Sequence, residues 1–154
     1  MKKHVFLLTF SISLLSCGGD RSSKMSSDIV GKWDLKNKKI GDHVVSLSTC
    51  EELYSSYEFK PNATSIVTKG DHLPQVSNCI FNQYNQTYTI ENGILKIHES
   101  TSAYEYEAHY KLLEVTPSSL VLQLYYSKEI DHGVNTTSNY TKSEQYTFYY
   151  EKDL

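Results

Sequence analysis

The segment from Ile29 to Leu35 reads IVGKWDL, and its alternation predicts a β-strand at the start of the fold. Its odd positions are Ile, Gly, Trp and Leu, whereas its even positions are Val, Lys and Asp. Because successive side chains of a strand point to opposite faces, this strand would bury Trp33 and leave the charges in water. Gly31 has no β-carbon, so another group can lie close over it. We therefore expect Trp33, the only tryptophan, to close one end of a barrel or sandwich.

The N-terminus has the features of a secretory signal peptide. Two lysines precede an apolar run from Val5 to Leu15, and residues 14–17 read LLSC. The run is shorter than the ~20 residues that a membrane-spanning helix needs. LLSC resembles a bacterial lipobox, in which Cys17 becomes the acylated first residue of the mature protein. The alternative is an ordinary secreted protein with a stray cysteine near its N-terminus.

The lipobox divides the chain into a signal peptide at residues 1–16, a small polar tether at 17–27 and a domain at 28–154. The mature protein would have 154 − 16 = 138 residues, which suits one domain. Loss of two lysines leaves 13 basic and 18 acidic residues, so the net charge moves from −3 to −5. This acidity argues against nucleic-acid partners. Membrane association would come from the lipid on Cys17.

Two further cysteines remain once Cys17 is acylated. An even remainder in an exported protein predicts one disulfide, between Cys50 and Cys79. A metal pair or two free thiols is the alternative.

Strand patterns dominate the rest of the chain. Asn92-Gly93 accepts the positive φ angles of a type I′ turn and predicts a hairpin. Ser48 to Glu51 has capping-box spacing for a short helical turn. Residues 36–42 and 127–145 are expected to be loops, and 70–83 is the least regular portion. Together the patterns predict about eight antiparallel strands, closed into a barrel or flattened into a sandwich. The strands expected after the first lie near 57–60, 64–68, 84–91, 94–98, 104–112, 120–126 and 146–150.

The lipobox followed by a Gly-x-Trp strand resembles the lipocalin-like domain lipoproteins of Gram-negative bacteria. The cysteine pair flanking the Tyr57–Phe59 strand, the Asn92-Gly93 hairpin and the Leu-Val-Leu strand at 120–122 are similar to that family too. The resemblance covers essentially the whole mature chain and implies a barrel that serves as a binding module.

One departure concerns the closed end of the barrel. Lipocalins usually place an arginine of a late strand over the tryptophan ring. The only arginine of this chain is Arg21, in the tether, and Lys142 is a compact point charge without a planar face.

The thirteen tyrosines carry the most functional content. Those of the later strands would face the barrel interior. They either fill a solid core, which an eight-stranded barrel can just accommodate, or surround a cavity. Barrel size favours the core. A cavity would suit an amphipathic or aromatic small molecule or an acyl chain.

Other patterns give weak chemical signals. Three Asp-His dipeptides, at 42–43, 71–72 and 131–132, could meet as a metal site, but Asp and His are common in solvated turns. Glu105 and Glu107 share one strand face, as a glycosidase pair might, yet they continue a polar outer face. The chain has no nucleophile elbow or phosphate loop.

We expect an all-β, single antiparallel up-and-down lipocalin-like barrel of about eight strands with a short helical turn. It would be a non-enzymatic lipoprotein of the bacterial envelope, in the outer membrane, without metal or cofactor. It would bind a small hydrophobic or amphipathic molecule. The alternative is a protein-interaction or inhibitor module with a solid core, acting through its loops on another envelope protein. The ligand-binding candidates are Trp33, Tyr104, Tyr106, Tyr110, Leu122, Leu124, Tyr126, Tyr146 and Phe148.

Overall fold

The structure is a computed structural model that describes residues 27–72, 78–134, 136–140 and 145–153. The expected signal peptide, Cys17, Arg21 and Lys142 lie outside these ranges. Ten strands and the short helix α2 make up most of the described chain. The elements are β1 (Gly31–Ile40), β2 (His43–Val45), α2 (Thr49–Tyr54), β3 (Ser56–Phe59), β4 (Thr64–His72), β5 (Cys79–Glu91), β6 (Ile94–Ser100), β7 (Tyr104–Val115), β8 (Ser119–Asp131), β9 (Thr136–Tyr140) and β10 (Tyr146–Lys152).

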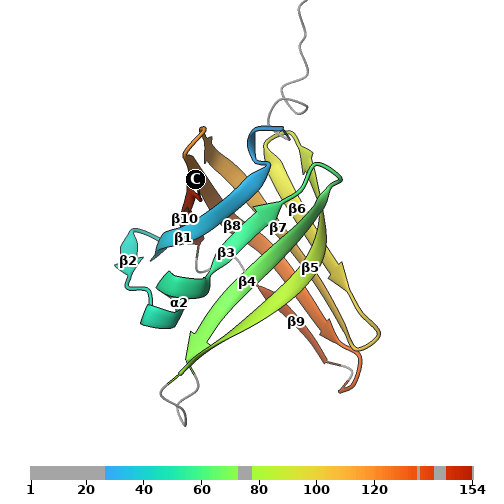
Figure 1. The fold of residues 1–154 in the computed structure, drawn as a ribbon. Coiled ribbons are helices and arrows are strands. Elements are labelled where there is room, and N and C mark those ends of the chain that lie inside the picture. The colour runs from blue at the N-terminus through green and yellow to red at the C-terminus, as the bar shows by residue number, and fades with distance from the viewer. Residues whose placement is uncertain (1–26, 73–77, 135, 141–144, 154) are drawn as a thin grey trace, which may run out of the picture.

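Eight of these strands close into an antiparallel barrel (Figure 1). Neighbours from β3 to β8 pair in chain order, β1 pairs with β3, and β10 pairs with both β8 and β1. The remaining two are extensions, since β2 pairs with β1 and β9 pairs with β8. The predicted eight-stranded antiparallel barrel is confirmed. The short helix α2 lies beside the lower part of the barrel in Figure 1.

The alternation of apolar and polar residues places the core inside the barrel. On β6, Leu95 and Ile97 are fully buried while the intervening Lys96 is half-buried. The β5–β6 turn has Asn92 and Gly93 at φ angles of 52° and 75°, as the predicted type I′ hairpin requires. Burying one large aliphatic or aromatic side chain stabilises a fold by roughly 1.5–3 kcal/mol. The stability of the fold therefore comes from many such side chains, which are buried around the inside of the barrel.

Trp33 closes one end of the barrel, as predicted. Its side chain is fully buried, and its indole Nε1 donates a hydrogen bond to the carbonyl oxygen of Ile29, at 2.6 Å. Lys152 of β10 lies opposite, with Nζ 5.1 Å from the centre of the Trp33 ring system and 3.0 Å from the carbonyl oxygen of Val30. Gly31 has a φ of 133°, and a β-carbon there would lie 2.7 Å from the Lys152 side chain. The backbone angle therefore favours glycine here, whereas the flexible end of the Lys152 side chain could move away from a β-carbon.

The contact between Lys152 and Trp33 corrects one sequence-based interpretation. Neither Arg21 nor Lys142 was a good candidate for a cation over the tryptophan, and both lie outside the described residues. The cation comes instead from the last residue of β10, because the register pairs Trp33 with Lys152. The Lys152 ammonium also donates a hydrogen bond to the carbonyl oxygen of Val30, for which the planar fork of an arginine is not needed.

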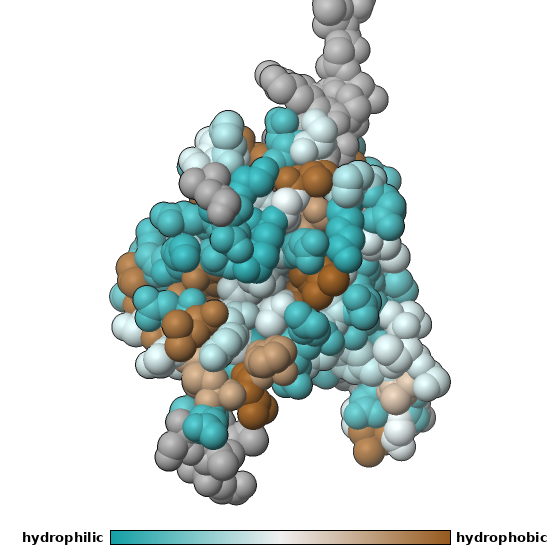
Figure 2. All heavy atoms as spheres, viewed as in Figure 1, coloured by the Kyte–Doolittle hydropathy of each residue, from teal (hydrophilic) through white to brown (hydrophobic). Residues whose placement is uncertain are grey.

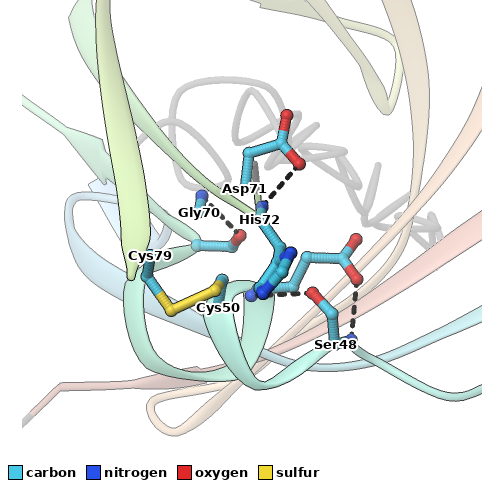
Figure 3. Close-up of a disulfide and its surroundings, with 8 residues drawn as sticks. Ser48, Cys50, Gly70, Asp71, His72 and Cys79 are labelled. Carbon is cyan, nitrogen blue, oxygen red and sulfur yellow. Dashed lines mark hydrogen bonds between the residues drawn. A yellow bond between two sulfur atoms is a disulfide. The ribbon is translucent and has the colours of Figure 1, made fainter. Parts of the chain in front are cut away.

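Helix α2 is fastened to the barrel by a disulfide, shown in Figure 3. The predicted bond between Cys50 of α2 and Cys79 of β5 is confirmed, with a Cα–Cα distance of 5.3 Å. The predicted capping box is also present, since Ser48 and Glu51 exchange hydrogen bonds between side chain and backbone. A β-carbon at Gly70 of β4 would lie 1.9 Å from the carbonyl oxygen of Cys50. Only glycine therefore lets α2 approach this strand.

Several strands are longer than their sequence patterns indicate. β1 runs on through the lysine-rich residues 36–40, and β9 lies within the expected loop at 127–145. β4 and β5 extend into the irregular portion, to His72 and from Cys79. These extensions are polar because they project beyond the apolar core. Backbone hydrogen bonds to the neighbouring strands hold them there, rather than burial of every second side chain. In the described part of the chain, no helix has the length and hydropathy to cross a bilayer.

Candidate functional site

The barrel interior is not filled. A cavity of about 570 Å³ occupies it, within the range of small-molecule sites. Its rim lies beside α2 and the end of β4, and includes Glu51, Asp71 and His72, two of which appear with the disulfide in Figure 3. Trp33 does not line it, because the tryptophan belongs to the packed end. The apolar and aromatic wall consists of Leu35, Tyr57, Val67, Tyr84, Tyr106, Tyr110, Leu124, Phe148 and Tyr150.

Tyrosine hydroxyls supply the polar groups of this wall. Tyr57, Tyr106 and Tyr110 are linked by side-chain hydrogen bonds. The ring of Tyr150 meets that of Tyr57 edge to face, with centroids 5.8 Å apart. Burial raises the pKa of Tyr57, Tyr110 and Tyr150 well above the ordinary value, and burial likewise raises the pKa of Tyr106. The wall is therefore uncharged and can both donate and accept hydrogen bonds.

A second, more polar cavity of about 590 Å³ adjoins the first. The two share Lys69, Tyr84 and Tyr106 in their walls, so they meet at these side chains. Two carboxylates, Glu99 and Glu129, line the polar cavity. Lys69 points its ammonium at rings rather than at either carboxylate, since Nζ lies 5.3 Å from the centre of Tyr84 and 5.8 Å from that of Tyr106. The interior thus joins an aromatic compartment to an acidic one.

The strand register explains why these polar groups lie together. Directly paired residues of antiparallel strands project to the same face of the sheet. Tyr106 of β7 pairs with Glu99 of β6 on one side and with Glu129 of β8 on the other. Ser65 of β4 pairs with Gln86 of β5, and both are buried. A row of polar side chains on the inner face therefore crosses β4, β5, β6, β7 and β8. It is buried at Ser65, Gln86 and Glu99 and exposed at Glu129.

Two atoms of this row are buried without a hydrogen-bond partner. Gln86 is 5 % exposed, and its amide nitrogen donates to Oε2 of Glu99 at 3.1 Å. Because a carboxylate only accepts, the amide oxygen of Gln86 must face away from Glu99, and Oε1 has no partner. The Ser65 hydroxyl is unpartnered too. Leaving such a group unsatisfied costs about 1–3 kcal/mol, so the row has unused hydrogen-bonding capacity.

The structure divides the predicted ligand-binding residues into three groups. Tyr106, Tyr110, Leu124 and Phe148 line the aromatic cavity, and Tyr104 lines the polar one. Trp33 and Leu122 are fully buried in packed core, and Tyr146 packs against that core outside the cavity walls. Tyr126, the remaining candidate, lies on the outer surface.

The prediction that Tyr126 faces inward is wrong because of a β-bulge. The register between β7 and β8 shifts between His109 and Tyr110, so that Tyr110 opposes Leu124 while His109 opposes Tyr126. His109 alternates with buried Ala108 and therefore points outward, and the rings of His109 and Tyr126 are 4.7 Å apart. One extra residue in β8 reverses the facing of every residue that follows it.

The polar half of the site was missed at the sequence level. Glu99 follows Leu95 and Ile97 at the inward positions of β6, and Gln86 lies between Tyr84 and Tyr88 at those of β5. The available signal was a polar residue at a position where the alternation of the strand predicts an apolar residue. Glu129 gave no such signal, because the bulge alone brings it inward.

The weaker chemical patterns do not assemble. In the ranges that the structure describes, no group of three or more His, Cys, Asp or Glu side chains is placed to hold a metal ion. Glu107 lies on the outer face of β7, where its carboxylate meets Nε2 of His109 at 2.7 Å. The glycosidase-like pair is thus on the outside of the barrel, away from both cavities.

Comparison with known proteins agrees with this architecture. The family model described as a lipocalin-like domain matches residues 29–122. The match begins at buried Ile29, next to the Trp33 end, and runs to Leu122 of β8, so it includes most strands that surround the cavities. No curated protein matches the chain. The family match covers more than half of the chain, and the closed barrel has the expected form. This chain therefore belongs to the lipocalin-like domain family.

Proposed function

We propose that this protein binds a small amphipathic molecule inside its barrel and does so without catalysing a reaction. The observation that carries the proposal is the cavity of about 570 Å³ with its aromatic wall. A solid interior would have favoured an interaction module instead. Apolar cavities of this size bury most of a small ligand's surface, and a few polar groups fix its orientation. Here the linked hydroxyls of Tyr106 and Tyr110 supply those groups.

A fluorescence titration with diphenylhexatriene, a neutral hydrocarbon probe, tests the proposal on the full chain. Val67 faces the cavity, and Val67→Trp should fill part of it and weaken probe binding at least about tenfold. Ile66 is the adjacent residue of the same strand and faces outward, so Ile66→Trp is the matched control and should bind as the wild type does. Equal binding by the wild type and both variants, or none by the wild type, would refute the proposal.

We further propose that the protein is held at the outer membrane of a bacterial envelope by lipid on Cys17. The support is the lipobox and the basic, apolar N-terminus. Mass spectrometry after expression in a Gram-negative host should find a mature chain that begins with diacylated or triacylated Cys17. Cys17→Ser should abolish the modification. An unmodified mature N-terminus in the wild type would contradict this proposal.

A second candidate function rests on an exposed apolar patch. Leu53 and Tyr54 of α2 and Phe81 of β5 are 63 %, 41 % and 57 % exposed, and the rings of Tyr54 and Phe81 stack 5.7 Å apart. Figure 2 shows brown, apolar atoms gathered around α2 and the neighbouring strand ends. Such a patch suits a protein partner. A photo-crosslinking residue at position 81 should then capture one envelope protein, and the same residue at exposed Thr89 should not.

A further inference from the structure

The acidic row inside the barrel has more hydrogen-bond acceptors than the protein's own donors satisfy. Glu99 is 8 % exposed and, within the described residues, accepts a side-chain hydrogen bond from Gln86. Gln86 lines the same cavity, and its amide oxygen, which faces away from Glu99, is buried without a partner. Neither carboxylate of the row forms an ion pair with Lys69 among the described residues, because that ammonium lies over aromatic rings. The unmet requirement is therefore for a donor with positive charge.

We propose that the polar end of the barrel binds a primary ammonium group, so that the ligand of the proposed site is an amphipathic amine. This inference rests on the proposed function, because the aromatic cavity would hold the apolar body of the same molecule. An ammonium has three N–H donors and no acceptor. It matches the buried carboxylate of Glu99 and the exposed carboxylate of Glu129, which line one cavity.

The distances across the sheet allow one ligand group to reach both carboxylates. Neighbouring strands are about 4.8 Å apart, so Glu99 and Glu129, which are separated by the strand that carries Tyr106, have backbones about 10 Å apart. Two glutamate side chains that project inward can close that gap around one small cation. Charge-assisted hydrogen bonds are stronger than those between neutral groups. The amine head therefore contributes affinity as well as orientation.

The surrounding tyrosines are consistent with a negative field at this end. Burial, followed by the charges of Glu129 and Glu99, raises the pKa of Tyr104 to about 12. Tyr104 therefore stays neutral and leaves the negative charge to the two carboxylates. Lys69 offsets part of this charge, which leaves the polar cavity with one excess negative charge from its Glu and Lys side chains. A carboxylate ligand such as a fatty acid is disfavoured by the same field.

Octylamine, octanol and octanoate test the inference, because they share one apolar body and differ in the head group. Isothermal titration calorimetry of the full chain at neutral pH should give octylamine at least about tenfold tighter binding than octanol, and octanoate the weakest. Glu99→Gln should remove the preference for octylamine over octanol and leave octanol affinity within about twofold. Octanol binding also shows that the variant barrel is intact. Glu107→Gln, on the outer face of β7, is the matched control and should change neither affinity.

The outcomes separate the two proposals. Equal or tighter binding of octanol or octanoate than of octylamine would overturn the ammonium site and leave the binding barrel standing. An octylamine preference that survives Glu99→Gln unchanged would also overturn it. Failure of all three compounds and of diphenylhexatriene to bind would instead refute the proposed function, and the inference with it.

Discussion

Raising the pH above the ordinary tyrosine pKa of about 10 should unfold the barrel steeply. Burial is the main cause that raises the pKa of Tyr57, Tyr106, Tyr110 and Tyr150 in the folded state. A group whose folded pKa is raised contributes stability that is complete below its unfolded pKa. That stability is lost as the pH rises from the unfolded toward the folded value. Here the unfolded chain releases protons that the folded chain retains, so alkali favours unfolding.

The magnitude follows from the number of such tyrosines. Each one lowers the free energy of unfolding by about 1.4 kcal/mol per pH unit, so the four together give a slope of about 5.5 kcal/mol per pH unit. A domain with a stability of about 5–15 kcal/mol would lose it within a few pH units. Tyr150→Phe removes a hydroxyl that makes no hydrogen bond in the described part of the chain. This variant should reduce the slope to about 4 kcal/mol per pH unit.

The assay records two signals during an alkaline titration. Ultraviolet absorbance counts ionised tyrosines, and far-ultraviolet circular dichroism reports the strands. We expect a group of tyrosines to ionise only together with the loss of strand signal, and the Tyr150→Phe transition to be less steep. Full ionisation of all thirteen tyrosines while the strands remain would refute the reasoning, because it would show that water already reaches the cavity wall.

Three further predictions concern the ends of the barrel. Replacing Cys50 and Cys79 by alanine should lower the free energy of unfolding by about 3–4 kcal/mol in urea, because the bond closes a loop with a separation of 29 residues; a loss near zero would contradict this. Gly70→Ala should cost about 1–3 kcal/mol or more in the same assay, since its β-carbon would overlap the backbone of α2, and an unchanged midpoint would show that α2 is not packed there. Lys152→Met should cost about 1–2 kcal/mol and change the fluorescence of Trp33, because a cation–π contact and a hydrogen bond are lost; identical fluorescence would refute that contact.

Most of the barrel could be predicted because its strands alternate strictly where they enclose the core. Trp33, the Asn92-Gly93 turn and the disulfide at Cys50 each depend on local chemistry that the sequence displays. Strand length was underestimated in polar segments such as residues 136–140, because their ladder hydrogen bonds leave no pattern of burial. The sequence therefore predicts the parts of the barrel wall that have one buried face. It does not predict the parts that have both faces in solvent.

The candidate site was harder to predict than the wall. A bulge is a property of two strands in register, so the inward turn of Glu129 and the outward turn of Tyr126 are invisible in β8 alone. Whether tyrosines fill a core or leave a cavity depends on volumes summed over eight strands, which no single strand shows. The cation over Trp33 was missed for a similar reason, since Lys152 is assigned to it only by the pairing of the first and last strands.

The most direct test of a ligand-binding barrel is to locate a bound molecule by nuclear Overhauser effects. The measurement uses isotope-labelled full chain with octanol, whose neutral head is indifferent to the acidic row. The account predicts contacts from octanol protons to the ring protons of Tyr110 and Tyr150, inside the cavity. Contacts only to Leu53 and Phe81, on the exposed patch, would contradict it and favour a surface that binds proteins.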